Sequence, residues 1–301
     1  MMLQQEFLLK ELHLEKQARE NFIQDLLSGR IGSDTDLFIT RGQIIGYDIL
    51  IPRVALIIDI YQFEKTAQKS FQTFKGLKEG EIYLQRLKND VLKTLQGIFI
   101  NLPQEIVSYI GGDKFVVLKT VNLKDLAKIS RKKMFVIGEK IKNVISQKMK
   151  FKVTIGIGEY HEGILGLHKS FREATQALDV GTKLQGAGGI YHINDLGIGR
   201  LLAEVRENTQ QEIIKKTFYS TKDVRGKKMN ETLLDTLKSF FDNNLSILKT
   251  AQTIYVHRNT LLYRLRRVKE ITGLDPKKFD DAVQLRIVLK MKIYQESNKG
   301  K

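Results

Sequence analysis

The stretch ILKTAQTIYVHRNTLLYRLRRVKEITG, Ile247 to Gly273, contains two helical patterns separated by a short turn. A short helix is expected from Ile247 to about Ile254, and Tyr255-Val256-His257 form the turn. A longer basic helix follows from Arg258 to Thr272, and Gly273 closes it because glycine accepts the left-handed conformation that ends many helices. A short helix, a turn of three residues and a longer basic helix predict a helix-turn-helix unit.

The two sides of the longer helix carry different residue types. Winding it at about 100° per residue places Leu261, Leu265 and Val268 on the side that faces the core. The opposite side carries residue types that bond to phosphates and base edges, and His257 and Arg258 at the helix start would lie beside the phosphate backbone. We therefore expect contacts to double-stranded DNA from His257, Arg258, Asn259, Thr260, Tyr263, Arg266 and Arg267. The alternative is that Asn259 only caps the helix and that the arginines form a solvated stripe.

The charge of the chain favours a polyanionic partner. Its 50 Lys and Arg residues outnumber 34 Asp and Glu residues, which gives a net charge of +16. The segment from Arg225 to Lys301 is especially basic, with 17 basic and 8 acidic residues. Just before the short helix, Glu231 to Phe241 carries one apolar stripe typical of a helix packed on a core.

The composition excludes several classes of protein and site. No apolar run approaches the ~18 residues of a membrane span, and the first residues lack the apolar core of a secretory signal. We therefore expect a cytoplasmic protein. There is no cysteine, and His161 and His168 are assigned no metal, so we expect neither a metal site nor a cofactor.

Before the helical C-terminus, predicted strands and helices alternate. A helix is expected from Glu6 to Leu27, and the glycine and aspartate content predicts irregular structure from Arg30 to Pro52. Between two short strands, Gly111-Gly112-Asp113 predicts a tight hairpin, because glycine tolerates the positive φ of such turns. Strands are predicted at 53–60, 105–110, 115–120, 151–158 and 189–193, and helices at 81–99, 122–148, 165–182 and 201–217.

These patterns predict an α+β chain in which an α/β domain precedes an all-α domain. A helical connector and irregular segment would occupy residues 1–52, and the α/β domain residues 53–200. A helix and a polar, basic linker would occupy residues 201–228, and the helix-turn-helix domain residues 229–301.

The run HRNTLLYRLRRVKEITGLD, His257 to Asp275, resembles the C-terminal helix-turn-helix of the carbohydrate diacid regulators and their purine-catabolism regulator relatives. That family carries a degenerate relative of the GGDEF domain before the DNA-binding unit. Gly111-Gly112-Asp113-Lys114-Phe115 resembles the GGDEF signature, and Ile57 to Phe63 resembles its first strand. Thr154 to Gly158 and Ser170 to Ala174 resemble the later strand and helix.

The resemblance implies a bacterial transcription factor, whose effector is not identified. Helix-turn-helix units commonly pair on two half-sites of double-stranded DNA, so we expect a homodimer. Carbohydrate diacid regulators begin with a sugar-diacid sensor domain, and this chain starts near the helix that would follow it. We therefore expect this sequence to lack that sensor, so that it is a fragment or a short paralogue, or its effector binds elsewhere.

The resemblance also implies that the middle domain is not an enzyme. Active GGDEF domains join two GTP molecules with Mg²⁺, and Asp113 and Asp59 occupy positions of metal-binding acids. However, Lys114 and Tyr61 replace two further acids, and Ala67-Gln68 replace the Asn-Asp pair that recognises guanine. The prediction is a sequence-specific regulator of carbohydrate or related catabolic genes. The alternatives are a diguanylate cyclase-like enzyme with a DNA-binding tail and a non-specific nucleic-acid-binding protein.

Overall fold

The computed structural model divides the chain into two compact units, Met1–Leu196 and Gly197–Lys301. Ala67, Gln68 and the predicted linker from Ser220 to Lys228 lie outside the described part of the chain. The residues that the structure describes are 2–32, 34–61, 63, 77–102, 104–123, 130–219 and 229–299.

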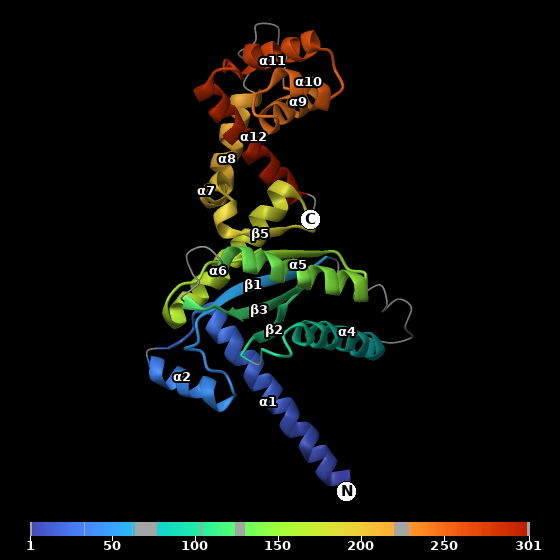
Figure 1. Ribbon diagram of the computed structural model, residues 1–301, viewed down its shortest axis with the longest axis vertical. Helices are drawn as coiled ribbons and strands as arrows, with labels where there is room; N and C mark the ends of the chain where they lie inside the picture. The colour runs from blue at the N-terminus through green and yellow to red at the C-terminus, as the bar shows by residue number, and fades with distance from the viewer. Residues whose placement is uncertain are drawn as a thin grey trace. The chain divides into compact units, whose positions relative to one another are not determined.

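A five-stranded mixed sheet forms the centre of the first unit, in the order β2-β3-β1-β4-β5 (Figure 1). The central strand β1 pairs antiparallel with both β3 and β4, β2 pairs antiparallel with β3, and β4 pairs parallel with β5. The strands are β1 (Arg53–Ile60), β2 (Ile106–Gly111), β3 (Lys114–Thr120), β4 (Val153–Ile157) and β5 (Ile190–His192). The hairpin between β2 and β3 lies at the predicted glycines, with φ of 107° at Gly111 and 60° at Gly112.

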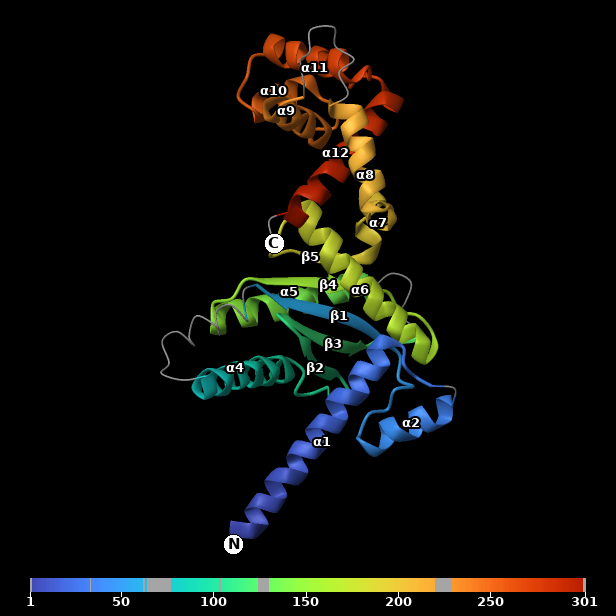
Figure 2. The same ribbon diagram turned by 180° about the vertical axis from the view of Figure 1, so that it is seen from behind.

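Helices cover both faces of this sheet, as the two opposite views show (Figure 1, Figure 2). Successive side chains of a strand point to opposite faces, so Leu56 and Ile58 enter one core and Ala55 and Ile57 the other. Helices α4 (Leu77–Ile98) and α5 (Ser130–Met149) pack on the first face. Helices α1 (Met2–Ser28) and α6 (Gly163–Gln185) pack on the second. The predicted α+β class is confirmed.

The segment from Arg30 to Pro52 differs from the prediction, because it contains helix α2 (Thr35–Ile44). Asp34 caps this helix by accepting a hydrogen bond from the backbone N–H of Leu37 at 3.0 Å. The ring of Phe38 stacks on that of Phe22 of α1, with 4.6 Å between centroids, and both rings are buried. Tertiary packing therefore stabilises a helix that glycine and aspartate content alone did not predict.

The second unit consists entirely of helical segments in its described part. They are α7 (Ile198–Glu204), α8 (Glu207–Ile214), a π-helical segment η3 (Lys215–Tyr219), α9 (Glu231–Asp242), α10 (Ile247–Thr253), α11 (Arg258–Thr272) and α12 (Phe279–Lys299). Leu202, Ile214 and Phe218 belong to the same buried cluster as Leu237 of α9 and Leu265 of α11. Residues from the helix predicted at 201–217 are thus part of this core.

Every helix within the described residues is too short or too polar to cross a lipid bilayer.

Candidate nucleic-acid interface

Local capping fixes the positions of α9, α10 and α11. Asn230 accepts a hydrogen bond from the backbone N–H of Leu233 at 2.9 Å, and Ser246 accepts one from that of Lys249 at 3.3 Å. At the C-terminal end of α11, Gly273 has a φ of 75° and donates its N–H to the carbonyl of Lys269 at 2.8 Å. These caps satisfy backbone groups that a helix terminus otherwise leaves unpaired.

The core side of α11 agrees with the prediction. Leu261, Leu265 and Val268 are at most 1% exposed and belong to the same buried cluster as residues of α9 and α12. This packing holds the opposite side of the helix toward solvent.

The solvent side of α11 carries five of the predicted residues, which are exposed: Arg258, Asn259, Thr260, Tyr263 and Arg266. Tyr263 is 53% exposed. His257 is the N-cap, because its Nδ1 accepts the backbone N–H of Asn259 at 3.2 Å. The Asn259 side chain is therefore not the cap and remains available to a ligand. Within the described part of the chain, no ion pair engages Arg266.

Arg267 differs from the other predicted contact residues, because it is buried. Its side chain is only 11% exposed, and it donates a hydrogen bond to the carboxylate of Glu270 on the same helix. Helix α9 packs against α11, and residues at its start line the same hollow as Arg267. A contact between Arg267 and a base edge stays a prediction, and in this structure its guanidinium pairs with Glu270.

Three exposed residues of α10 and the turn were not among the predicted contacts: Lys249, Gln252 and Tyr255. Tyr255 is 96% exposed and adopts a φ of 53°, which is uncommon for a residue with a side chain. The sequence already places an aromatic residue, Tyr255, in the three-residue turn. Only the fold shows that its side chain is exposed.

Two family models match this chain. The PucR C-terminal helix-turn-helix domain matches residues 233–291, and the GGDEF-like domain matches residues 28–180, about half of the chain. The chain belongs to the carbohydrate diacid and purine catabolism regulator family. Members of this family regulate transcription, and the helix-turn-helix unit is their DNA-binding part.

Three relatives illustrate the family. The carbohydrate diacid regulator of Escherichia coli is 25% identical over 97% of this chain and 70% of its own length. The purine catabolism regulatory protein of Bacillus subtilis is 30% identical over 51% of this chain and 28% of its own. The proline-responsive transcriptional activator PutR of Bacillus subtilis is 24% identical over 62% of this chain and 46% of its own. The match therefore spans less than half the length of either Bacillus protein.

In this family member, the hairpin of the GGDEF-like domain places a cation beside an acid. Lys114 is the direct cross-strand partner of Asp59, and the backbone carbonyl of Asp113 accepts the N–H of Ile60 at 2.9 Å. Lys114 is exposed. The positive charge of Lys114 disfavours the binding of a divalent cation beside Asp59, because like charges repel. The predicted Ala67-Gln68 replacement lies outside the described residues.

The two histidines assigned no metal make hydrogen bonds within the GGDEF-like domain. The Nε2 of His161 lies 2.9 Å from the Glu173 carboxylate, and the Nδ1 of His168 donates to the carbonyl of Leu27 at 2.6 Å. Helix α6 begins at Gly163, two residues earlier than predicted, so His161 precedes it. Among the described residues, no three His, Cys, Asp or Glu side chains group closely enough to hold a metal ion.

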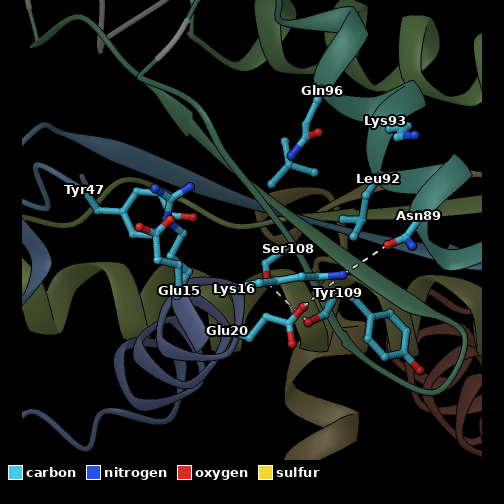
Figure 3. Close-up of a pocket in the computed structure, with 12 residues that line it drawn as sticks. Glu15, Lys16, Glu20, Tyr47, Asn89, Leu92, Lys93, Gln96, Ser108 and Tyr109 are labelled. Atoms are coloured by element: carbon cyan, nitrogen blue, oxygen red, sulfur yellow. Dashed lines mark hydrogen bonds and ion pairs between the residues drawn. The ribbon is translucent and has the colours of Figure 1, made fainter. Parts of the chain in front are cut away.

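A hollow of about 320 Å³ lies between α1, α4 and strand β2 of the same domain (Figure 3). Lys16 of α1 reaches across it and donates to the side-chain oxygen of Asn89 of α4 at 3.1 Å, as the dashed line in Figure 3 shows. Ser108 and Tyr109 of β2 form its floor. The Lys16–Asn89 hydrogen bond thus joins the first helix of the chain to a helix that packs on the sheet.

Proposed function

We propose that this protein is a sequence-specific transcriptional regulator of catabolic genes, and that α11 enters the major groove of DNA. The observation that carries the proposal is the solvent side of α11, where Asn259, Tyr263 and Arg266 are exposed side by side along the helix. Asparagine pairs with adenine N6 and N7, and arginine with guanine O6 and N7. In this proposal Asn259 and Arg266 contact base edges.

Residues at the start of α11 would contact the DNA backbone. Arg258 and Thr260 are exposed beside the helix N-terminus, whose backbone dipoles favour anions. His257 keeps its capping role and leaves Nε2 available to a phosphate. Such contacts fix the position of the protein on the duplex without reading its sequence.

The proposal includes a homodimer that acts in the cytoplasm. Helix-turn-helix units commonly bind two half-sites about one helical turn apart, and a two-fold dimer matches such an operator. The genes concerned are proposed to be catabolic because the relatives include regulators of carbohydrate diacid, purine and proline responses. Sedimentation of the full chain with and without operator DNA tests the dimer.

The GGDEF-like domain is proposed to act without catalysis. Lys114 opposite Asp59 supports this view, because its positive charge repels a divalent cation that would bind at Asp59. The domain would then contribute self-association or signal transmission rather than a nucleotide product.

The experiment is selection of an operator from a random duplex library with the full chain, followed by binding titrations at several salt concentrations. Arg266→Ala and Asn259→Ala should each weaken operator binding far more than random-duplex binding. The control is Lys277→Ala, an exposed cation beyond α11, which should weaken both DNAs equally or not at all. Equal losses on both DNAs for Arg266→Ala and Asn259→Ala would mean that α11 is only a basic surface.

A further inference from the structure

A second feature of the DNA-binding unit lies on the flank of α11, where that helix meets the first turn of α9. A hollow of about 430 Å³ opens there. Its polar lining comes from both helices: Asn230 and Thr232 of α9, and Tyr263, Arg264 and Arg267 of α11. Tyr263 also belongs to the exposed side of α11, so the hollow adjoins the surface proposed to enter the major groove.

The hollow carries net positive charge. Arg264 donates to the neutral hydroxyl of Thr236 at 3.2 Å, and within the described residues it makes no salt bridge. Arg267 is offset by Glu270, which pairs with it. Two further acids of α9, Glu231 and Asp235, do not line the hollow, because the winding of α9 turns them away from Asn230 and Leu233. Among the described residues around the hollow, one uncompensated guanidinium, that of Arg264, therefore remains beside the start of α9.

We propose that this hollow binds a phosphate of the DNA backbone, with Arg264 as the principal donor. The inference rests on the proposed DNA binding by α11. A helix is about 10–12 Å across and the major groove about 12 Å wide, so the flanks of a helix in the groove face the two phosphate backbones. The first turn of α9 lines the same hollow and adds the positive end of its helix dipole.

Arg267 has a supporting role in this arrangement. Its buried guanidinium forms part of the wall of the hollow, and the pairing with Glu270 offsets its charge and holds it in place. In this arrangement the flank of α11 contacts the DNA backbone and positions the protein. Asn259 and Arg266 supply the contacts that depend on the DNA sequence.

The first test is Arg264→Gln in the full chain, titrated against the selected operator and a scrambled duplex. Loss of one phosphate contact should weaken both DNAs by a similar factor, about tenfold, and lower the salt slope by about one unit. The matched control is Arg286→Gln on α12. In the wild type, the Arg286 guanidinium donates to the carbonyl of Phe241, near the opposite end of α9. That variant should keep the wild-type affinity and salt slope.

A second variant guards against a folding defect in Arg264→Gln. Thr232 is exposed in the first turn of α9, where an acidic residue suits the helix dipole, so Thr232→Glu should fold normally. The new carboxylate should repel a phosphate and weaken both DNAs. Gln284→Glu, which adds the same charge at an exposed site on α12, should leave binding unchanged.

The inference is overturned if Thr232→Glu and folded Arg264→Gln bind both DNAs with wild-type affinity and slope while the wild-type chain binds its operator. A wild-type chain that selects no operator and binds no duplex would instead overturn the proposed function itself.

Discussion

Arg267 donates a hydrogen bond to the carboxylate of Glu270 one turn further along α11, while its neighbour Arg266 is exposed to solvent. The two adjacent arginines therefore have different environments on one helix. Arg267 is part of the packing between α9 and α11, and Arg266 is available to an external partner.

This difference predicts opposite phenotypes for two neighbouring substitutions. Arg267→Ala should lower the free energy of unfolding by about 1–3 kcal/mol, because it removes a buried side-chain stem and its hydrogen bond. Arg266→Ala should leave stability unchanged within about 0.5 kcal/mol and lose about 1–3 kcal/mol of discrimination between operator and random DNA. Urea unfolding and parallel DNA titrations measure the two effects. The reverse pattern would contradict the assignment of Arg266 as the base-contacting arginine.

The extent of the C-terminal core predicts which fragment folds. Phe218 is fully buried in the cluster that holds α9, α11 and α12, so a fragment from Gly197 to Lys301 should be helical and melt cooperatively. A fragment that starts at Met229 lacks Leu202, Ile214 and Phe218 and should be much less stable. Circular dichroism compares the two fragments, with Phe218→Ala in the longer one expected to cost about 3–5 kcal/mol. Equal melting of both fragments would show that the preceding helices are dispensable.

The hairpin predicts that purified protein with GTP and Mg²⁺ forms no cyclic dinucleotide. Lys114 opposes Asp59 across the strands and disfavours a metal ion between the hairpin and the first strand. Chromatography of the reaction mixture, alongside an active cyclase as a positive control, measures the product. Product that disappears in Asp113→Ala would support the enzyme alternative instead.

The environment of His192 predicts how acid affects the GGDEF-like domain. Burial, aided by the nearby positive charge of Arg131, lowers the pKa of His192 to about 4, although Glu173 acts in the opposite direction. Its ring stacks on Phe135, and its Nε2 lies 3.4 Å from the Glu159 carboxylate. Between pH 6.5 and about 4 the unfolded chain binds a proton at this site that the folded chain does not. The free energy of unfolding should therefore decrease as the pH falls through this range.

The matched variant for this prediction is His192→Asn, which removes the titrating ring. Its unfolding free energy should fall less between pH 7 and pH 5 than that of the wild type, and measurements at pH 8 supply the reference at which the ring is neutral in both states. Identical pH dependence in the two proteins would show that His192 is not protonated on unfolding.

The sequence by itself determined the local features of this protein and indicated its family. The spacing of Leu261, Leu265 and Val268 predicted the buried side of α11, because a regular helix repeats its faces without help from the rest of the chain. The paired glycines at 111 and 112 predicted the hairpin, because only short-range backbone sterics are involved. The run from His257 to Asp275 indicated the family, which the matched family models show.

Only the tertiary structure decided the features that depend on contacts between distant segments. Arg267 is buried where α11 packs beside α9, which lies about thirty residues earlier in the chain and lines the same hollow. Helix α2 forms against Phe22 of α1, and Phe218 enters a core built mainly from residues after Met229. Sequence periodicity shows which side of a helix is apolar, whereas burial of a polar flank depends on which other helix packs there, and that is fixed by long-range packing.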